Sequence, residues 1–315
     1  MAAVGKAFLV ARREVRLLSR SRATLGAAVL LASVAWLPAI LLPLRRGSLG
    51  VASFTEMVPL QIALAAVILP LLALLAGAEL FAGELEDGSL VQALTLPISR
   101  RACFVGKCLG RVVTLGTAYL AAFASAGVAV AVVQGSDGWR DWAAVTATGL
   151  LLSLSAGGIG AALGSAGSGR VRAFGAALVS WIFVVFALDA LLLTLVVSLA
   201  PAPPGAIGEH GHDELSAPRS ARNTERPIHD PHARESELEE PRASALSGRL
   251  MALSPVSLFR LTCLSASPDL RPRLALALPG GAGAGLWSTI VAGWLIWLAA
   301  PLIVGLRRFL RADLS

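Results

Sequence analysis

The chain has 315 residues, of which 56% are hydrophobic and only 15% are charged. This composition is far more apolar than that of a soluble globular chain. The formal net charge is +7, but long apolar runs separate the basic residues, which argues against a nucleic-acid-binding surface. The three cysteines, Cys103, Cys108 and Cys263, are too few and too scattered for a disulfide framework, and no Cys/His spacing typical of zinc is present. The composition therefore indicates a membrane protein.

Six segments are long and apolar enough to cross a bilayer, which takes roughly 20 mostly apolar residues in a helix. They are residues 23–44, 58–80, 112–133, 142–163, 173–199 and 285–306. Basic residues precede the first segment, as they do in a secretory signal, but the segment is longer than a signal core, so we interpret it as a retained anchor. The sequence predicts an all-α membrane protein with six transmembrane helices.

Lys and Arg gather on one side of the predicted membrane. That side holds Lys6, Arg12, Arg13, Arg16, Arg20, Arg22, Arg100, Arg101, Lys107, Arg111, Arg170, Arg172, Arg307, Arg308 and Arg311. The short loops of the other side hold only Arg45, Arg46 and Arg140. Basic loops stay in the cytoplasm, so both termini, including the tail 307–315, are predicted there. The long loop 200–284, which is left out of this comparison, is then extracytoplasmic.

The segment before the first crossing, residues 1–22, has apolar residues at helical spacing. They are Val4, Phe8, Ala11, Val15 and Leu18, and most of the arginines lie elsewhere around the helix. We expect an amphipathic helix on the inner membrane surface. It serves either as an orienting anchor or as a brace that transmits motion from a cytoplasmic partner to the bundle.

The long outer loop has two parts. Residues 203–249 are rich in Pro, Glu, Arg, His and Ser and are predicted to be disordered, because they have too few apolar residues to offset the cost of ordering. All four histidines, His210, His212, His229 and His232, lie there; they either bind copper, nickel or zinc loosely or are inert. Residues 250–264 are expected to form a short amphipathic helix at the outer interface.

The connection between the second and third crossings, residues 81–111, carries the most information. Acidic residues Glu84, Glu86 and Asp87 lead into Gly88, an expected turn, and Ser89 is expected to cap a short helix. The apolar residues of that helix are Leu90, Val91, Ala93 and Leu94. Pro97 ends it, and Ser99 is placed to cap the next helix at Arg100. This pattern predicts a stiff cytoplasmic hairpin with a small apolar knob flanked by charge.

The order and spacing of these residues resemble the membrane permeases of the type 2 ABC exporters. In that family an acidic-Gly-[Ser/Thr]-Leu run is followed by Pro-[Ile/Val]-Ser-Arg and then by Gly-Lys, here Gly106 and Lys107. The resemblance implies that the hairpin is the coupling region that docks on a separate ATPase subunit. The residues so implied are Glu84, Glu86, Asp87, Gly88, Ser89, Leu90, Pro97, Ser99 and Arg100.

Three further stretches, residues 181–189, 253–260 and 297–314, are similar to the permease of the transporter for nitrous-oxide reductase maturation. This likeness implies a bacterial inner-membrane location and, besides the ATPase, an extracytoplasmic copper-maturation protein as a partner. The hydrophilic insert at about 203–249 departs from that pattern. An exporter of lipid, drug or polysaccharide in the same family is the alternative.

No phosphate-binding loop for ATP is recognisable in the sequence. Cys108 follows Gly106-Lys107 where a Walker A motif needs Ser or Thr, and Arg101 occupies the position of its first glycine. ATP and Mg²⁺ are therefore expected on the partner, with no cofactor on this chain. Since one chain has one hairpin and an ATPase dimer has two sites, we expect a homodimer with its twofold axis along the membrane normal.

A few polar residues fall within or next to the crossings. Asp189 lies inside the fifth, where an ionised carboxylate costs a few kcal/mol unless it is paired or hydrated. It either fixes helix packing through hydrogen bonds or lines a substrate path. Glu79 is either part of the coupling region or a solvated helix end. Gly157, Gly160 and Gly164 in the fourth crossing permit close helix approach.

Two functions of other classes are also considered. An intramembrane enzyme needs converging polar groups within the bilayer, and Asp189 stands nearly alone among the crossings, with no HExxH motif and no Ser/His pairing. A membrane scaffold without transport predicts that function survives removal of the hairpin.

Overall fold

The computed structural model describes residues 2–95, 98–166, 169–199, 253–266 and 284–311, and this part of the chain contains helices and no strand. The elements are α1 Ala2–Leu18, α2 Arg22–Arg45, α3 Phe54–Glu86, α4 Ser89–Leu94, α5 Arg100–Gln134, α6 Trp139–Gly164, α7 Arg170–Ile182, the π-helix η1 Phe183–Ala187, α8 Leu188–Leu199, α10 Pro255–Ala266 and α11 Ala284–Arg311. The predicted all-α class is confirmed.

Six helical stretches in these residues are long and apolar enough to cross a membrane. They are Arg22–Arg45, Phe54–Glu86, Arg100–Gln134, Trp139–Gly164, Arg170–Leu192 and Leu286–Arg311. Each matches one of the six predicted crossings. The second and third helices are longer than the predicted crossings, mainly at the end of the bundle where α4 lies. Polar residues there continue the same helices beyond their apolar part.

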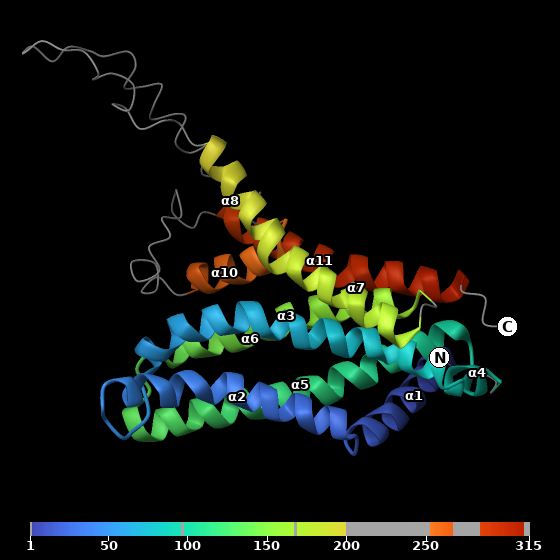
Figure 1. Ribbon diagram of the computed structural model, residues 1–315, viewed down its shortest axis with the longest axis horizontal. Coiled ribbons are helices and arrows are strands. Elements are labelled where there is room, and N and C mark those ends of the chain that lie inside the picture. Colours follow the sequence, from blue (N-terminus) through green and yellow to red (C-terminus); the bar gives the residue numbers. More distant parts are fainter. Residues whose placement is uncertain (1, 96–97, 167–168, 200–252, 267–283, 312–315) are drawn as a thin grey trace, which may run out of the picture.

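The helices run roughly side by side, and α3 and α6 form the centre of the bundle (Figure 1). α2 packs on α3 and α5, whereas α7 packs on α3 and α11 packs on α6. α1 and the end of α11 lie near α4 at one end of the bundle (Figure 1). The loops 46–53 and 135–138 lie at the opposite end.

The backbones of α3 and α6 touch. A Cβ placed on Gly77 would lie 2.2 Å from the Gly157 carbonyl oxygen, and one on Gly160 would lie 2.2 Å from the Leu74 carbonyl oxygen. Gly164 meets Ala78 in the same way. The expectation that small residues of the fourth crossing permit close approach is confirmed, and the contact makes α3 and α6 one rigid unit.

The fifth crossing contains a π-helical turn, η1, between α7 and α8. A π turn inserts one extra residue, which rotates the following side chains by about 100° relative to an uninterrupted α-helix. Before the turn, the Trp181 indole N–H donates to the Val67 carbonyl oxygen of α3 over 2.9 Å. After the turn, Asp189 faces α10 instead.

α10 differs from the expected interfacial helix. It begins at Pro255, and most of its side chains are buried against α6, α11 and α3, including Phe259 and Leu258, which are fully buried. Its polar side chains point into the bundle as well: Trp294 donates to Thr262 Oγ1 over 3.1 Å. The hydroxyls of Thr262 and Ser265 also bond within the protein, to backbone carbonyl oxygens of the same helix.

α1 packs along the first half of α5. The packed face consists of Ala7, Ala11 and Glu14, whereas Phe8 is 66% exposed. Phe8 does not pack on α5, and the prediction that the apolar face of this helix lies on the membrane surface stays a prediction. α5 presents Gly106 and Gly110 there, so small residues of α1 fit against it more closely than Phe8 does.

Several predictions fall outside the described residues. These are the disordered insert 203–249 with His210, His212, His229 and His232, the turn at Pro97 and the last residues of the tail 307–315. They stay predictions.

We expect Gly160→Ala to lower the free energy of unfolding by about 1–3 kcal/mol, because the new Cβ forces the backbones of α3 and α6 apart. The matched control is Gly175→Ala in α7, where a Cβ meets nothing within 4 Å. The unfolding midpoint of the detergent-solubilised protein, followed by tryptophan fluorescence, measures both. Equal midpoints for the two variants would contradict the backbone contact.

Candidate functional site: the elbow between α3 and α5

The end of α3, the short α4 and the start of α5 form a bend, which we call the elbow (residues 79–111). Gly88 makes the turn with φ +71°, a left-handed conformation that favours glycine. Gly88 also precedes the first residue of α4, so Ser89 is part of that helix and not its cap. Ser99 caps α5 as predicted, since its Oγ accepts a hydrogen bond from the Ala102 N–H over 3.3 Å.

The centre of the elbow is a buried lysine between two carboxylates. Lys107 of α5 is 3% exposed and Glu14 of α1 is 7% exposed. The Lys107 ammonium donates to Glu84 of α3 and, over 3.4 Å, to Glu14. A buried charge is stable only when it is paired and hydrogen bonded, so each of the three side chains depends on the others. This triad ties α1, α3 and α5 together.

Two other acidic residues of α3 hold the start of α7. The Glu79 carboxylate pairs with the Arg170 guanidinium at 3.3 Å, and the Glu86 carboxylate accepts the Arg170 backbone N–H over 3.0 Å. A carboxylate at a helix N-terminus also interacts favourably with the helix dipole. Of the two interpretations of Glu79, the structure favours a role in the elbow, since its carboxylate is paired.

An aromatic cluster joins the elbow to the end of α11. Phe81 and Phe104 stack with ring centroids 5.0 Å apart, and Phe309 lies against both rings, at 5.2 and 5.6 Å. Leu90 of α4 is fully buried in the same cluster. The predicted apolar knob is therefore wrong at Leu90, because this side chain belongs to the protein's own core.

Polar side chains are exposed where α3, α4 and α5 meet. Among the residues of this region whose side chains the structure describes, the exposed polar ones are Glu86, Asp87, Ser89, Gln92, Thr95, Ser99, Arg100 and Arg101. Of the residues that the resemblance implies for ATPase docking, Asp87, Ser89, Ser99 and Arg100 lie on this surface, and Glu86 does so while bonded to α7. Glu84 and Leu90 instead bond and pack inside the elbow.

A second polar cluster lies in the other half of the bundle, where Asp189 of α8 meets α10. The Asp189 carboxylate pairs with Arg260 at 2.5 Å and accepts a hydrogen bond from Ser257. This arrangement favours the packing role over a substrate path. The contacts of Asp189 with Arg260 and Ser257 also join two of the stretches that carry the family resemblance, residues 181–189 and 253–260.

The sequence patterns missed three ionic partners: Glu14, Arg170 and Arg260. Glu14 had a usable signal, since it is the only acidic residue in the basic segment 1–22. A single carboxylate in so basic a segment suggests a cationic partner, which in the structure is Lys107. Arg170 and Arg260 carry no comparable local signal, because each meets an acid far away in the sequence.

Comparison with known proteins agrees with this architecture. Residues 8–314 match the model of the ABC-2 family transporter proteins. The probable ABC transporter permease protein NosY of Stutzerimonas stutzeri is 34% identical over 176 residues, which cover 54% of this chain and 62% of that protein. The protein of the same name from Pseudomonas aeruginosa is 31% identical over 201 residues, 60% of this chain and 70% of that protein. The aligned part thus spans less than two thirds of the first relative.

The chain belongs to the ABC-2 family of transporter proteins and is an integral membrane protein. Within that class it is similar to permease subunits of ABC transporters that are named NosY, as the sequence resemblance predicted.

We expect Lys107→Met to lower the free energy of unfolding by about 3 kcal/mol, because it leaves the Glu14 carboxylate buried without its cation. The unpaired Glu84 carboxylate contributes less to this loss of stability, since its side chain is 30% exposed and water reaches it. The double variant Lys107→Met/Glu14→Gln removes the uncompensated charge and should regain part of the loss. A double-mutant cycle of unfolding midpoints measures this coupling, and additive effects would exclude the pairing.

Proposed function

We propose that the chain converts ATP hydrolysis on a separate subunit into movement of its membrane helices, with the elbow as the receiving surface. The observation that supports this most is the buried triad of Glu14, Lys107 and Glu84. A surface loop that only connects two crossings needs no buried ion pairs to neighbouring helices. A loop that transmits force needs such ion pairs, because they make it stiff. Displacement of α4 is then passed to the neighbouring helices and does not merely deform the elbow.

The route of that force follows the contacts of the elbow. Through Lys107 a push on α4 reaches α1, and through Arg170 it reaches the start of the fifth crossing. Through Phe81, Phe104 and Phe309 it reaches α11. α3 passes the movement to α6 by direct backbone contact. In this proposal α1 acts as a brace and not only as an anchor.

On this proposal the elbow, α1 and the end of α11 lie in the cytoplasm, in agreement with the bias of Lys and Arg toward that side. The ATPase is made in the cytoplasm, so it reaches only one end of the bundle. Two permease chains then serve the two sites of an ATPase dimer, each chain offering one elbow. ATP and Mg²⁺ bind to the ATPase alone.

We expect Asp87→Arg to reduce co-purification of the ATPase at least tenfold, about 1.4 kcal/mol, because it reverses an exposed charge at the centre of the proposed docking surface. The control is Asp137→Arg, an exposed residue of the same type in the loop at the opposite end of the bundle. Both proteins are co-expressed in cells, and the mass of the complex is measured by light scattering.

Wild type and Asp137→Arg should give complexes with two permease and two ATPase chains. Loss of the ATPase with Asp137→Arg and not with Asp87→Arg would place the elbow on the wrong side of the membrane. Asp87 is chosen rather than Glu84, because Glu84 takes part in the buried triad and its replacement would also affect stability.

For the biological role, we propose delivery of mechanical work or a substrate outward for the maturation of the copper site of nitrous-oxide reductase. This rests on the similarity to permeases named NosY and on the resemblance of residues 181–189, 253–260 and 297–314. The extracytoplasmic partner would be a copper-maturation protein, and the histidines of the insert would meet it on that side. Export of a lipid, drug or polysaccharide is the alternative.

We expect deletion of the gene to yield nitrous-oxide reductase that is exported but deficient in copper. Complementation with wild type should restore the copper content of the purified reductase, measured by elemental analysis. At matched expression, the Asp87→Arg variant should restore about a tenth or less of the copper content that wild type restores. A fully copper-loaded reductase in the deletion strain would exclude this role and favour the alternative exporter.

A further inference from the structure

The side of α1 that faces away from α5 carries only positive charge. α1 packs on α5 through Ala7, Ala11 and Glu14, which are buried. The opposite side, which we call the outward face, exposes three arginines, Arg12, Arg13 and Arg16. At about 100° per residue, these arginines fall within an arc of about 100° that is centred opposite the packed side. Since Glu14 is the only acid of residues 1–22 and points toward α5, no carboxylate of α1 offsets them.

The neighbouring helices do not neutralise the outward face either. The carboxylate of Glu84, like that of Glu14, is engaged with Lys107. Within the part of the chain that the structure describes, none of the three outward arginines forms an ion pair with a carboxylate. Arg20, also exposed, adds a further positive charge in the turn between α1 and α2. The outward face therefore has an uncompensated charge that favours an external anion.

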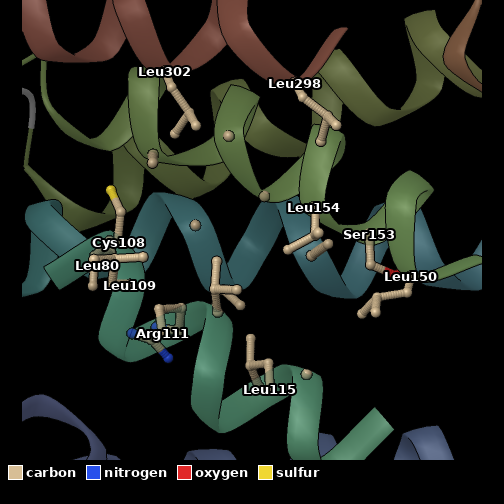
Figure 2. Close-up of a pocket in the computed structure, with 18 of the residues that line it drawn as sticks. Leu80, Cys108, Leu109, Arg111, Leu115, Leu150, Ser153, Leu154, Leu298 and Leu302 are labelled. Atoms are coloured by element: carbon tan, nitrogen blue, oxygen red, sulfur yellow. The ribbon is translucent and has the colours of Figure 1, made fainter. Parts of the chain in front are cut away.

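The buried arginine of the same region is in the opposite situation. Arg111 lies on the wall of an apolar cavity of about 440 Å³ between α3, α5, α6 and α11 (Figure 2). The cations around it, Arg111 included, are balanced by three carboxylates, those of Glu14, Glu79 and Glu84. The cavity has no excess charge with which to select an anion, so the excess lies on the outward face of α1.

Two contacts place α1 next to the points where its neighbours are expected to enter the bilayer. A short turn joins α1 to α2, the first crossing, which Ser21 caps. On the other side, α1 packs against Gly106 and Gly110 of α5, which directly precede the predicted third crossing at 112–133. These positions favour the membrane surface, at the level of the lipid headgroups, as the surroundings of the outward face.

Large apolar side chains lie among and beside the outward arginines. Phe8 is 66% exposed, Leu9 63% and Leu17 57%. Contact of such side chains with water is unfavourable. At the boundary between headgroups and acyl chains, apolar side chains reach the acyl region while guanidinium groups stay at the phosphates. Phe8, Arg12 and Arg16 follow one another at intervals of four residues, so they form one row along the helix that fits this boundary.

We propose that the outward face of α1 binds anionic phospholipids of the leaflet on the elbow side, with Phe8 in the acyl region and Arg12, Arg13 and Arg16 at the headgroups. Each cation next to an anionic membrane surface strengthens binding about fivefold. Phosphatidylcholine is bound less tightly, because its quaternary ammonium offsets the charge of its phosphate. An orienting anchor needs no particular lipid, whereas this face selects one by charge.

The test is photo-cross-linking of the full chain in phosphatidylcholine vesicles. The vesicles contain equal traces of phosphatidylglycerol and phosphatidylcholine that carry the same photoactivatable acyl chain, and cross-linked peptides of α1 are quantified by mass spectrometry after chymotrypsin digestion. Wild-type α1 should cross-link to phosphatidylglycerol at least tenfold more than to phosphatidylcholine. Arg12→Gln/Arg13→Gln/Arg16→Gln should reduce this ratio to about twofold or less. Lysine at the same three positions should keep most of it, since the attraction depends on charge.

The matched control removes the same charge at the opposite end of the bundle. It is Arg45→Gln/Arg46→Gln/Arg140→Gln, a set of three exposed arginines. Its α1 peptides should show the wild-type ratio, because the measurement is local to α1. The unfolding midpoints of both triple glutamine variants should stay close to that of wild type, since the replaced side chains are exposed.

Equal cross-linking of the two lipids to wild-type α1 would overturn the proposal, and so would a ratio that the glutamine variant leaves unchanged. If that variant keeps the ratio but loses the ATPase in co-purification, the arginines form a protein-docking surface instead. The cross-linking uses the permease without the ATPase, so its result does not depend on docking at Asp87. Failure of either proposal is thus distinguishable from failure of the other.

Discussion

The ammonium of Lys107 is the group on which the rest of the structure depends. It is 3% exposed and lies in the first half of a helix that continues into the membrane. Such a charge is stable there only while it is paired, and Glu84 and Glu14 supply the carboxylates, so loss of both would leave a buried ion without a counter-charge. The helices that supply these carboxylates, α3 and α1, are therefore fixed to α5 by electrostatics as well as by packing.

The remaining contacts of the elbow add two more helices to this unit. Glu79 and Glu86 hold Arg170 at the start of α7, and the rings of Phe81 and Phe104 hold Phe309 of α11. All of them lead to α3, whose backbone touches that of α6. In the other half of the bundle, Asp189 and Arg260 join the fifth crossing to α10. Ion pairs thus connect helices in both halves of the bundle, while small residues bring the backbones of α3 and α6 together.

The sequence predicted the elbow as a bend but not the direction in which its side chains point. Gly88 and Ser99 were assigned correctly from turn and cap preferences, which depend on neighbouring residues alone. Leu90 was assigned to an exposed knob, but it is fully buried. The error has a physical cause: an apolar residue at a helical spacing is buried or exposed according to what the neighbouring helices offer, and here an aromatic cluster covers Leu90.

By itself the sequence determined the all-α class, the six crossings and the ABC-2 family, because hydrophobic length and the spacing of the elbow motif are local properties. Only the tertiary structure decided which charges pair. Lys107 meets Glu14 across 93 positions and Arg260 meets Asp189 across 71, and no local pattern encodes such distances. The same holds for the cavity at Arg111, since its walls come from five helices that become neighbours only when the bundle folds.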